Sequence, residues 1–240
     1  IGLSDSSGSL GSKVWKNSEF YCSKFNEGDV VAVKGIPSLY RNQIELNIAH
    51  IAKYDPLKYM KYGFDSAMII PKIESDAQIL WGEINKYFKK MGSREVLIKK
   101  IYSDYKKSVT LFPSNTELEF QVEGAYLRDT VKALKISDIL ISKSCGKNAI
   151  DSELIYSLIC LSRFHLITGY EKDIFYKIRA EALDRGVMTV FYDIFKKYRK
   201  LIDSQFFFSL EKCLFDSSCE DYGFERKIVD EIFSLVEHAS

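Results

Sequence analysis

Hydrophobic and polar residues alternate along the first fifty residues of the chain. In the segment 43–48, Ile and Leu residues fall on one face and Gln, Glu and Asn residues on the other, which is the pattern of a half-buried β-strand. A valine-rich run at 28–35 precedes it, and residues 40–43 predict a tight turn between two strands. The pattern therefore predicts a small curled sheet over residues 1–54. Because the chain begins within a strand-like run, a first strand of this sheet is expected to lie before Ile1.

Beyond residue 74 the apolar residues recur every three to four positions, as they do on one face of an α-helix. The first helix is expected to begin at Ser75 or Asp76, either of which can act as N-cap. A segment at about 151–167 is apolar nearly all round, which predicts a helix in the centre of its domain. Two further helices are expected, one within about 121–142 and one over about 225–238.

The clearest amphipathic stripe lies near the C-terminus, and its apolar face is formed by Val187, Val190, Phe191, Ile194, Tyr198, Leu201 and Ile202. The opposite face is basic and is either simply solvated or part of a binding patch. Its basic residues are Lys196, Lys197, Arg199 and Lys200, with Lys86, Lys89 and Lys90 as candidate neighbours. In the last helix the period predicts that Ile228, Ile232 and Leu235 are buried.

The change of period divides the chain into two domains. Residues 55–73, which include Pro56, Gly63 and Pro71, fit neither period and predict a linker. The predicted fold class is α+β and multidomain, with a β domain at 1–54 and a helical domain at 74–240.

Composition limits the function without naming it. The formal charge is +1, from 34 basic and 33 acidic residues, so any nucleic-acid binding must rest on a local patch. Five cysteines without a C-x-x-C pair fit reduced thiols in a cytoplasmic protein. The longest apolar run, Leu154 to Leu161, is far shorter than the roughly 20 residues of a membrane helix. A membrane is therefore not an expected partner.

Catalytic and metal-binding motifs are not found in the sequence. The three histidines, His50, His165 and His238, have no second ligand at helical spacing, and His165 reads as a core or helix-end histidine. Phosphate-loop, dinucleotide and serine-hydrolase motifs are missing as well. The adjacent carboxylates Glu220 and Asp221 read as a solvated loop or helix start. We expect no catalytic residue, no metal ligand and no cofactor.

Three short motifs in the first domain carry a family resemblance. They are Asp5-x-Ser7-Gly8-Ser9-Leu10-x-x-Lys13-Val14-Trp15, then Gly28-Asp29-Val30-Val31-x-Val33-Lys34-Gly35, then Tyr40-Arg41-x-Gln43-x-x-Leu46-x-Ile48. Together they resemble the OB-fold module of the YhaM-like 3′-5′ exoribonucleases. The resemblance implies a five-stranded OB-type β-barrel, whose first strand would be missing here, followed by an all-α domain of the HD phosphohydrolase superfamily.

The metal ligands that the family would show are replaced in this chain. A Gly-Leu-x-x-His signature is matched by Gly124 to Arg128, which places Arg128 at the histidine. The His-Asp doublet is matched by Ser162-Arg163, and a later Gly-His step by Asp184-Arg185. A His-His pair is matched by Ser217-Ser218. Serine and arginine do not substitute for neutral imidazole as ligands of a divalent metal, so the resemblance implies a noncatalytic homologue.

Arginines at three of these positions suggest a second hypothesis for the helical domain. Guanidinium groups of Arg128, Arg163 and Arg185 could hold a phosphate where the resemblance implies that a dication once sat. The alternative is that they are surface or ion-paired arginines in a decayed pocket.

The β domain supplies the candidate nucleic-acid-binding residues Lys13, Trp15, Lys34, Tyr40 and Arg41. Trp15 and Lys13 share one face of their strand, while Lys34, Tyr40 and Arg41 are expected at strand ends. Aromatic rings that stack on bases and cations that contact phosphates are the usual parts of a single-strand site. The alternatives are that Trp15 packs against the helical domain and that Tyr40 and Arg41 form an ordinary solvated turn.

Three functions therefore remain open. The first is a noncatalytic protein that binds single-stranded RNA or DNA, with RNA the favoured ligand. The second is a working exoribonuclease or phosphodiesterase with rearranged ligands, which would need Mn²⁺ or Mg²⁺. The third is an interaction scaffold that binds no nucleic acid. Homo-oligomerisation is left open in all three.

Overall fold

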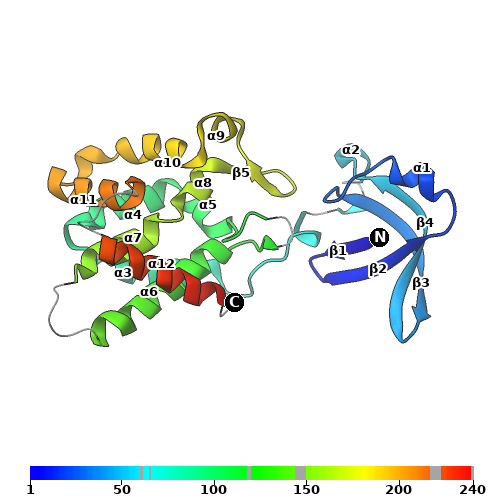
Figure 1. Cartoon of the computed structure of the whole chain (residues 1–240), viewed down its shortest axis with the longest axis horizontal. Helices are drawn as coiled ribbons and strands as arrows, with labels where there is room; N and C mark the ends of the chain where they lie inside the picture. Colours follow the sequence, from blue (N-terminus) through cyan, green and yellow to red (C-terminus); the bar gives the residue numbers. More distant parts are fainter. Residues whose placement is uncertain (60–61, 65, 118–119, 144–149, 217–222, 239–240) are drawn as a thin grey trace. The chain divides into compact units, whose positions relative to one another are not determined.

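The computed structural model describes residues 1–59, 62–64, 66–117, 120–143, 150–216 and 223–238 of the 240-residue chain. The chain forms two compact units, Ile1–Lys72 and Ile73–Ser240, and Figure 1 labels their elements. The first holds a sheet and the second is mostly helical, so the α+β class is confirmed. The stretch predicted as a linker carries two short helices, α2 (Pro56–Tyr59) and the 3-10 helix η2 (Ser66–Met68).

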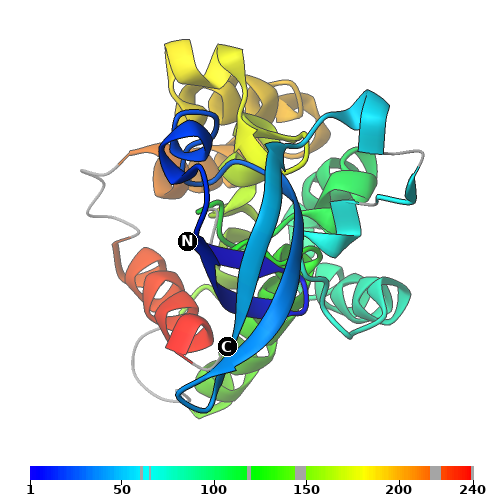
Figure 2. The ribbon, with the colours of Figure 1, turned by 90° about the vertical axis from the view of Figure 1, so that its right-hand side faces the viewer.

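The sheet of the first unit has four strands in the order β1-β2-β4-β3. Its elements are β1 (Gly2–Asp5), β2 (Gly8–Val14), α1 (Ser18–Cys22), β3 (Val31–Tyr40) and β4 (Gln43–Lys53). The pairs β1–β2 and β3–β4 are antiparallel, whereas β2 and β4 run parallel. Figure 2 shows this curled sheet from the side of the first unit.

The prediction of a five-stranded closed barrel is corrected to an open sheet of four strands among the described residues. A barrel closes only when its two edge strands pair with each other or with a further strand. Here β1 pairs only with β2, and β3 pairs only with β4, in the sheet that the structure describes. Alternation along the chain predicts strands but not whether their sheet closes.

The long hairpin of β3 and β4 follows the predicted turn. Arg41 and Asn42 at its tip have φ of 50° and 61°, the left-handed conformation that two-residue hairpin turns of type I′ require. The register shifts between Lys34 and Gly35, because Gly35 pairs with Ile48 whereas Lys34 pairs with His50. Lys34 therefore lies inside β3, and its predicted position at a strand end is wrong.

One face of the sheet forms the small core of the first unit. Ser12 of β2 and Ile48 and Ile51 of β4 are buried on this inner face. Burial fades toward the hairpin tip, where Ile44 is 62 % exposed. The predicted alternation of β4 is thus present, but its apolar residues are buried only in the C-terminal half of the strand.

The second unit contains most of the helices, at α3 (Ala77–Phe88), η3 (Gly92–Arg94), α4 (Glu95–Asp104), α5 (Lys106–Leu111), α6 (Ala125–Lys143), α7 (Ser152–Leu161), α8 (Phe164–Gly169), α9 (Ala180–Arg185), α10 (Val187–Lys196), η5 (Arg199–Leu201), α11 (Ser204–Phe215) and α12 (Gly223–His238). The Asp76 carboxylate caps α3 by accepting a bond from the Gln78 amide at 2.7 Å, which confirms the expected helix start. Eight consecutive residues of α7, Leu154 to Leu161, are buried, which confirms its central position.

Two predictions for this unit are corrected. The unit is not all-α, because β5 (Tyr170–Lys172) and β6 (Tyr176–Ile178) form a hairpin. The hairpin is held where Tyr176 donates its amide to Oε1 of Gln121 and accepts a bond from Nε2 of Gln121, each at 3.0 Å. The helix predicted over 151–167 is divided into α7 and α8. The helix predicted within about 121–142 is α6, which begins at Ala125 after Gly124 with φ of 82°.

In α12, two of the three residues predicted to be buried are replaced in the core by their immediate neighbours in sequence. Ile232 is buried as expected, but Leu235 is exposed, and the helix buries Val229, Phe233 and Val236. Apolar residues occupy so many positions of this helix that the period alone leaves the orientation of its buried face ambiguous.

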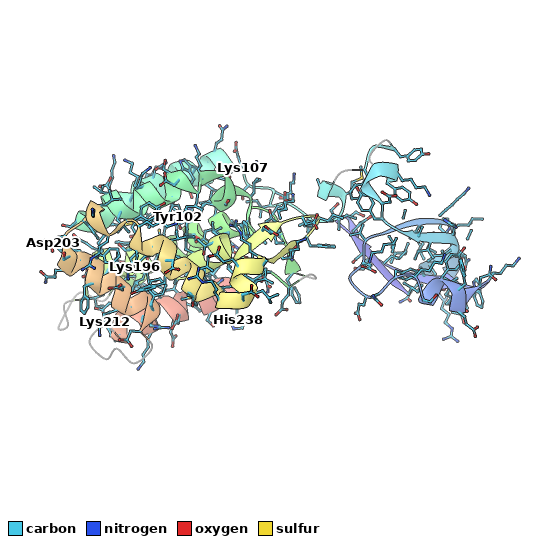
Figure 3. The ribbon with its side chains drawn as sticks, turned by 90° about the horizontal axis from the view of Figure 1, so that it is seen from above. Tyr102, Lys107, Lys196, Asp203, Lys212 and His238 are labelled. Carbon is cyan, nitrogen blue, oxygen red and sulfur yellow. The ribbon has the colours of Figure 1, made fainter. Side chains whose placement is uncertain are left out.

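Aromatic side chains fill the core of the helical unit. Tyr102 lies among the packed helices (Figure 3), is fully buried and donates to the Cys160 carbonyl at 2.7 Å. Phe195 stacks on Phe207 with ring centroids 4.6 Å apart. Burial raises the pKa of the Cys160 thiol to about 12. In the described part of the chain, no helix has the length and apolarity to cross a membrane.

Candidate functional site

The face of the sheet opposite its core carries a group of exposed and half-buried side chains, which we call the outer face. Strand register assigns its members, because Lys13 pairs with Asn47, Ile36 also pairs with Asn47, and Ser38 pairs with Glu45. Trp15 directly follows β2, and Tyr40 ends β3. The outer face consists of Lys13, Trp15, Ile36, Ser38, Tyr40, Glu45 and Asn47.

A hydrogen bond anchors the edge of the Trp15 ring, while most of the side chain is exposed to solvent. The indole Nε1 donates to Oδ1 of Asn47 at 2.8 Å, and Nδ2 of Asn47 donates to Oγ of Ser38 at 2.8 Å. This relay joins β2, β4 and β3, since its three members come from different strands or their ends. The Trp15 side chain nevertheless remains 73 % exposed. An indole fixed in this way is a preorganised flat surface.

Lys13 lies beside both aromatic rings. Its Nζ is 4.3 Å from the ring centroid of Tyr40 and 6.0 Å from that of Trp15. The same ammonium pairs with Oε2 of Glu45 at 2.6 Å. Tyr40 is 49 % exposed, and the Arg41 guanidinium carbon lies 5.3 Å from its ring centroid. The structure thus brings together four of the five predicted residues, namely Lys13, Trp15, Tyr40 and Arg41.

Lys34 lies on the same side of the sheet but farther along it. It is exposed, stands two positions before Ile36 on β3, and pairs in register with His50 beyond the shift. Six positions of strand, about 20 Å, lie between Lys34 and Tyr40. Its proposed contact with nucleic acid would therefore be made at the opposite end of this surface from Tyr40 and Arg41.

Sequence reasoning missed the polar members of the outer face, Glu45, Asn47 and Ser38. The alternation of β4 places Glu45 and Asn47 on its polar face. That signal does not reveal that β4 lies beside β2, because parallel strands far apart in sequence pair without a local turn motif. Only the register shows that Asn47 reaches Trp15 and that Glu45 reaches Lys13.

The chemistry of the outer face suits a flat ring with a polar edge. Stacking of an aromatic side chain on a nucleic-acid base contributes roughly 1 to 3 kcal/mol of binding free energy per base. Exposed cations beside them add attraction to a phosphate or to the ring system itself. The outer face offers both kinds of contact within a few ångströms.

The three arginines of the helical unit are each paired with carboxylates. Arg128 pairs through Nε with Asp129 at 2.7 Å. The other two also bind acidic partners, Arg163 at Glu237 and Arg185 at Glu181 and Asp193. Arg163 additionally lies over the Phe233 ring at 4.1 Å. The structure does not bring the three arginines together on a shared partner, and it favours the ion-paired alternative for each.

Metal-ligating side chains do not cluster in the described part of the helical or the sheet unit, where no group of three or more His, Cys, Asp or Glu residues could hold an ion. Ser217-Ser218 and Glu220-Asp221 lie outside the described residues. His165 lies at a helix start with Nδ1 3.2 Å from the Ser162 carbonyl oxygen, and burial lowers its pKa. Its expected role as a half-buried helix-end histidine fits this position.

A cavity of about 440 Å³ lies between α10 and α11, and it is lined by Met188, Thr189, Tyr192, Phe208, Glu211, Lys212, Phe215 and Asp216. The charged groups at its rim bind each other or their neighbours. Tyr192 donates to Glu211 at 3.0 Å, and Lys212 pairs with Asp216 at 3.2 Å. Figure 3 labels Lys196 and Lys212 on this part of the molecule.

Comparison with known proteins identifies no relative. No protein-family model, curated protein or solved structure matches the chain. The functional argument therefore rests on the side chains of the outer face.

Proposed function

We propose that this protein binds single-stranded nucleic acid on the outer face of its N-terminal sheet, without cleaving it. The observation that carries the proposal is the exposed Trp15 ring, anchored by Asn47, beside Lys13 and Tyr40. An exposed tryptophan held by a hydrogen bond loses little further side-chain freedom when a base stacks on it.

Single strands are the favoured ligand because their bases are free to stack. In a duplex the base faces are already covered, and duplex binding depends mainly on neutralising many phosphates. This chain has a formal charge of +1, so it has little overall attraction for a polyanion. We propose RNA as the more favoured strand on the strength of the family resemblance.

We also propose that this open four-stranded sheet is related to the OB fold through its strand order. Support comes from the parallel pairing of β2 and β4 and from α1 between β2 and β3. In an OB barrel, the last four strands follow this order and one further strand joins the two edges. The helical unit would then correspond to an HD-like domain of the YhaM-like family.

The noncatalytic part of the proposal rests on donor chemistry. Where the resemblance expects metal ligands, the chain has Arg128, Ser162-Arg163 and Asp184-Arg185. A guanidinium is a cation with donors only and does not ligate a metal ion. The carboxylates that pair with Arg128, Arg163 and Arg185 further support a structural use of these side chains.

The test is a fluorescence-anisotropy titration of a labelled single-stranded oligonucleotide with the wild type and with Trp15→Ala. Loss of one stacked base should weaken binding by about 5- to 150-fold, the equivalent of roughly 1 to 3 kcal/mol. Phe20→Ala is the matched control, because Phe20 is an exposed aromatic residue of the same unit outside the outer face. Equal affinity of Trp15→Ala and the wild type would overturn the proposed site.

The same labelled strand, incubated with the protein and Mn²⁺, tests whether the bound ligand is cut. We expect the strand to remain full length on a denaturing gel, for RNA and for DNA. Stepwise shortening from the 3′ end that stops on adding a chelator would instead establish the exonuclease alternative.

A further inference from the structure

We infer that the ion pair with Glu45 keeps Lys13 from binding a phosphate of the ligand. The outer face would then hold the strand mainly through contacts with its bases. This inference rests on the proposed function and concerns how the same site divides its contacts between bases and backbone. The ion pair of Lys13 and Glu45 lies in the middle of the site, between the Trp15 and Tyr40 side chains that would stack on bases.

The ion pair uses the cation closest to both rings. Lys13 Nζ and Glu45 Oε2 are 2.6 Å apart, and the two side chains are 38 % and 21 % exposed. The Tyr40 ring covers another side of the ammonium at 4.3 Å. A phosphate oxygen that approaches Lys13 therefore meets a carboxylate already bound there, and must displace it or lie beside its negative charge.

Replacing the Glu45 carboxylate by a ligand phosphate at Lys13 adds little binding free energy. Exposed ion pairs between Lys and a carboxylate contribute weakly to stability and are screened by salt. A phosphate that replaces Glu45 forms a pair of the same kind while it leaves the Glu45 carboxylate without its partner. The net attraction of Lys13 for the strand is correspondingly small.

Arg41 is a cation of this region that can contact phosphate without such competition. It lies at the hairpin tip over the exposed Tyr40 ring, and the ion pairs found among the described residues do not include it. The charges of Lys13, Glu45 and Arg41 sum to one positive charge, which corresponds to about one phosphate contact. For a single strand, the logarithm of affinity falls against the logarithm of salt with a slope of roughly −0.7 per phosphate contact.

The test measures this salt slope for the wild type and for Glu45→Gln by anisotropy titration with a single-stranded oligonucleotide. The amide keeps the shape of Glu45 and removes its charge, so Lys13 becomes available to a second phosphate. We expect the slope to become steeper by about 0.7, the contribution of one further phosphate contact. Affinity at low salt should rise by roughly two- to fivefold, the range that exposed ion pairs support.

Two variants make the result specific to the ion pair. Glu27→Gln adds the same positive charge on the loop before β3 and should leave the slope unchanged. The double variant Glu45→Gln with Lys13→Gln should return to the wild-type slope, because the released cation is removed as well. If Glu45→Gln matches the wild type, or if Glu27→Gln steepens the slope equally, the inference is wrong.

A different experimental result would overturn the proposed function. Unmeasurable binding by the wild type, or equal affinity of Trp15→Ala and the wild type, overturns the site itself and the inference with it. Binding that depends on Trp15 but is insensitive to Glu45→Gln overturns only the inference.

Discussion

The two units of this protein use aromatic residues in opposite ways. In the helical unit the rings of Phe88, Tyr102, Phe164, Phe191, Phe195 and Phe207 are fully buried. In the sheet unit Trp15 and Tyr40 are exposed, and the buried apolar residues described there are Ile48, Ile51 and Ile70. Buried aromatic rings thus stabilise the fold of the helical unit, whereas Trp15 and Tyr40 form the candidate binding surface of the sheet unit.

The difference teaches that residue type does not by itself indicate a role. Phe195 contacts Phe191, Phe207 and Phe215 with centroid distances between 4.6 and 6.2 Å, so its removal would leave a cavity. Trp15 has instead one hydrogen bond at its edge and solvent over much of its ring. Substitutions in the two groups should therefore separate stability from binding.

The largest effect is expected from Phe195→Ala in the helical unit. Truncation of a fully buried phenylalanine costs about 3 to 5 kcal/mol of unfolding free energy. Urea denaturation followed by circular dichroism at helical wavelengths measures it, with the helical transition fitted separately from that of the sheet unit.

Phe208→Ala is the control for this change, because Phe208 lies on the next helix but is exposed. Its cost should stay within about 0.5 kcal/mol. Oligonucleotide affinity of both variants, measured where the protein is folded, should equal that of the wild type. Equal destabilisation by the two substitutions would contradict the contrast between buried and exposed rings.

A smaller effect on binding is expected from Asn47→Ala in the sheet unit. Asn47 accepts the indole hydrogen bond of Trp15, so its loss lets the ring leave its fixed orientation. Binding should weaken by about 0.5 to 1.5 kcal/mol, the usual range for one hydrogen bond. Asn26→Ala, a change of an exposed amide residue on the loop before β3, is the comparison. An affinity for Asn47→Ala equal to that of Asn26→Ala would show that the Trp15 orientation does not matter.

The last expected effect is a pH dependence of the helical unit. Burial lowers the pKa of His165 below its ordinary value of 6.5, so the unfolded chain takes up the proton first as the pH falls. Stability should therefore decrease between pH 7 and pH 5.5, with a slope of at most about 1.4 kcal/mol per pH unit. Urea midpoints across this window should show less change in His165→Asn. His238→Gln, at the exposed end of α12, should keep the wild-type dependence; the opposite pattern would contradict this assignment.

Several elements could be predicted from the sequence because short-range patterns specify them. The turn at Arg41 and Asn42, the cap at Asp76 and the buried α7 all depend on residues close together in the chain. Each has one strong local cause, namely left-handed turn residues, a carboxylate cap and a continuous apolar run.

The failed predictions depend on contacts distant in sequence. The open sheet edge, the β5–β6 hairpin held by Gln121 and the division between α7 and α8 are set by tertiary packing. In the site, Trp15 and Lys13 were predicted from their type. Their partners Asn47 and Glu45 could not be, because the parallel pairing of β2 and β4 has no local signature.

The most direct test measures stacking on Trp15 itself. The chain has two tryptophans, Trp15 and Trp81, and Trp81→Phe leaves Trp15 as the single indole reporter. Titration of this variant with an unlabelled single-stranded oligonucleotide should quench the Trp15 emission, with the same midpoint as binding followed by anisotropy. Binding by anisotropy with unchanged Trp15 emission would contradict a base-stacking role for the outer face.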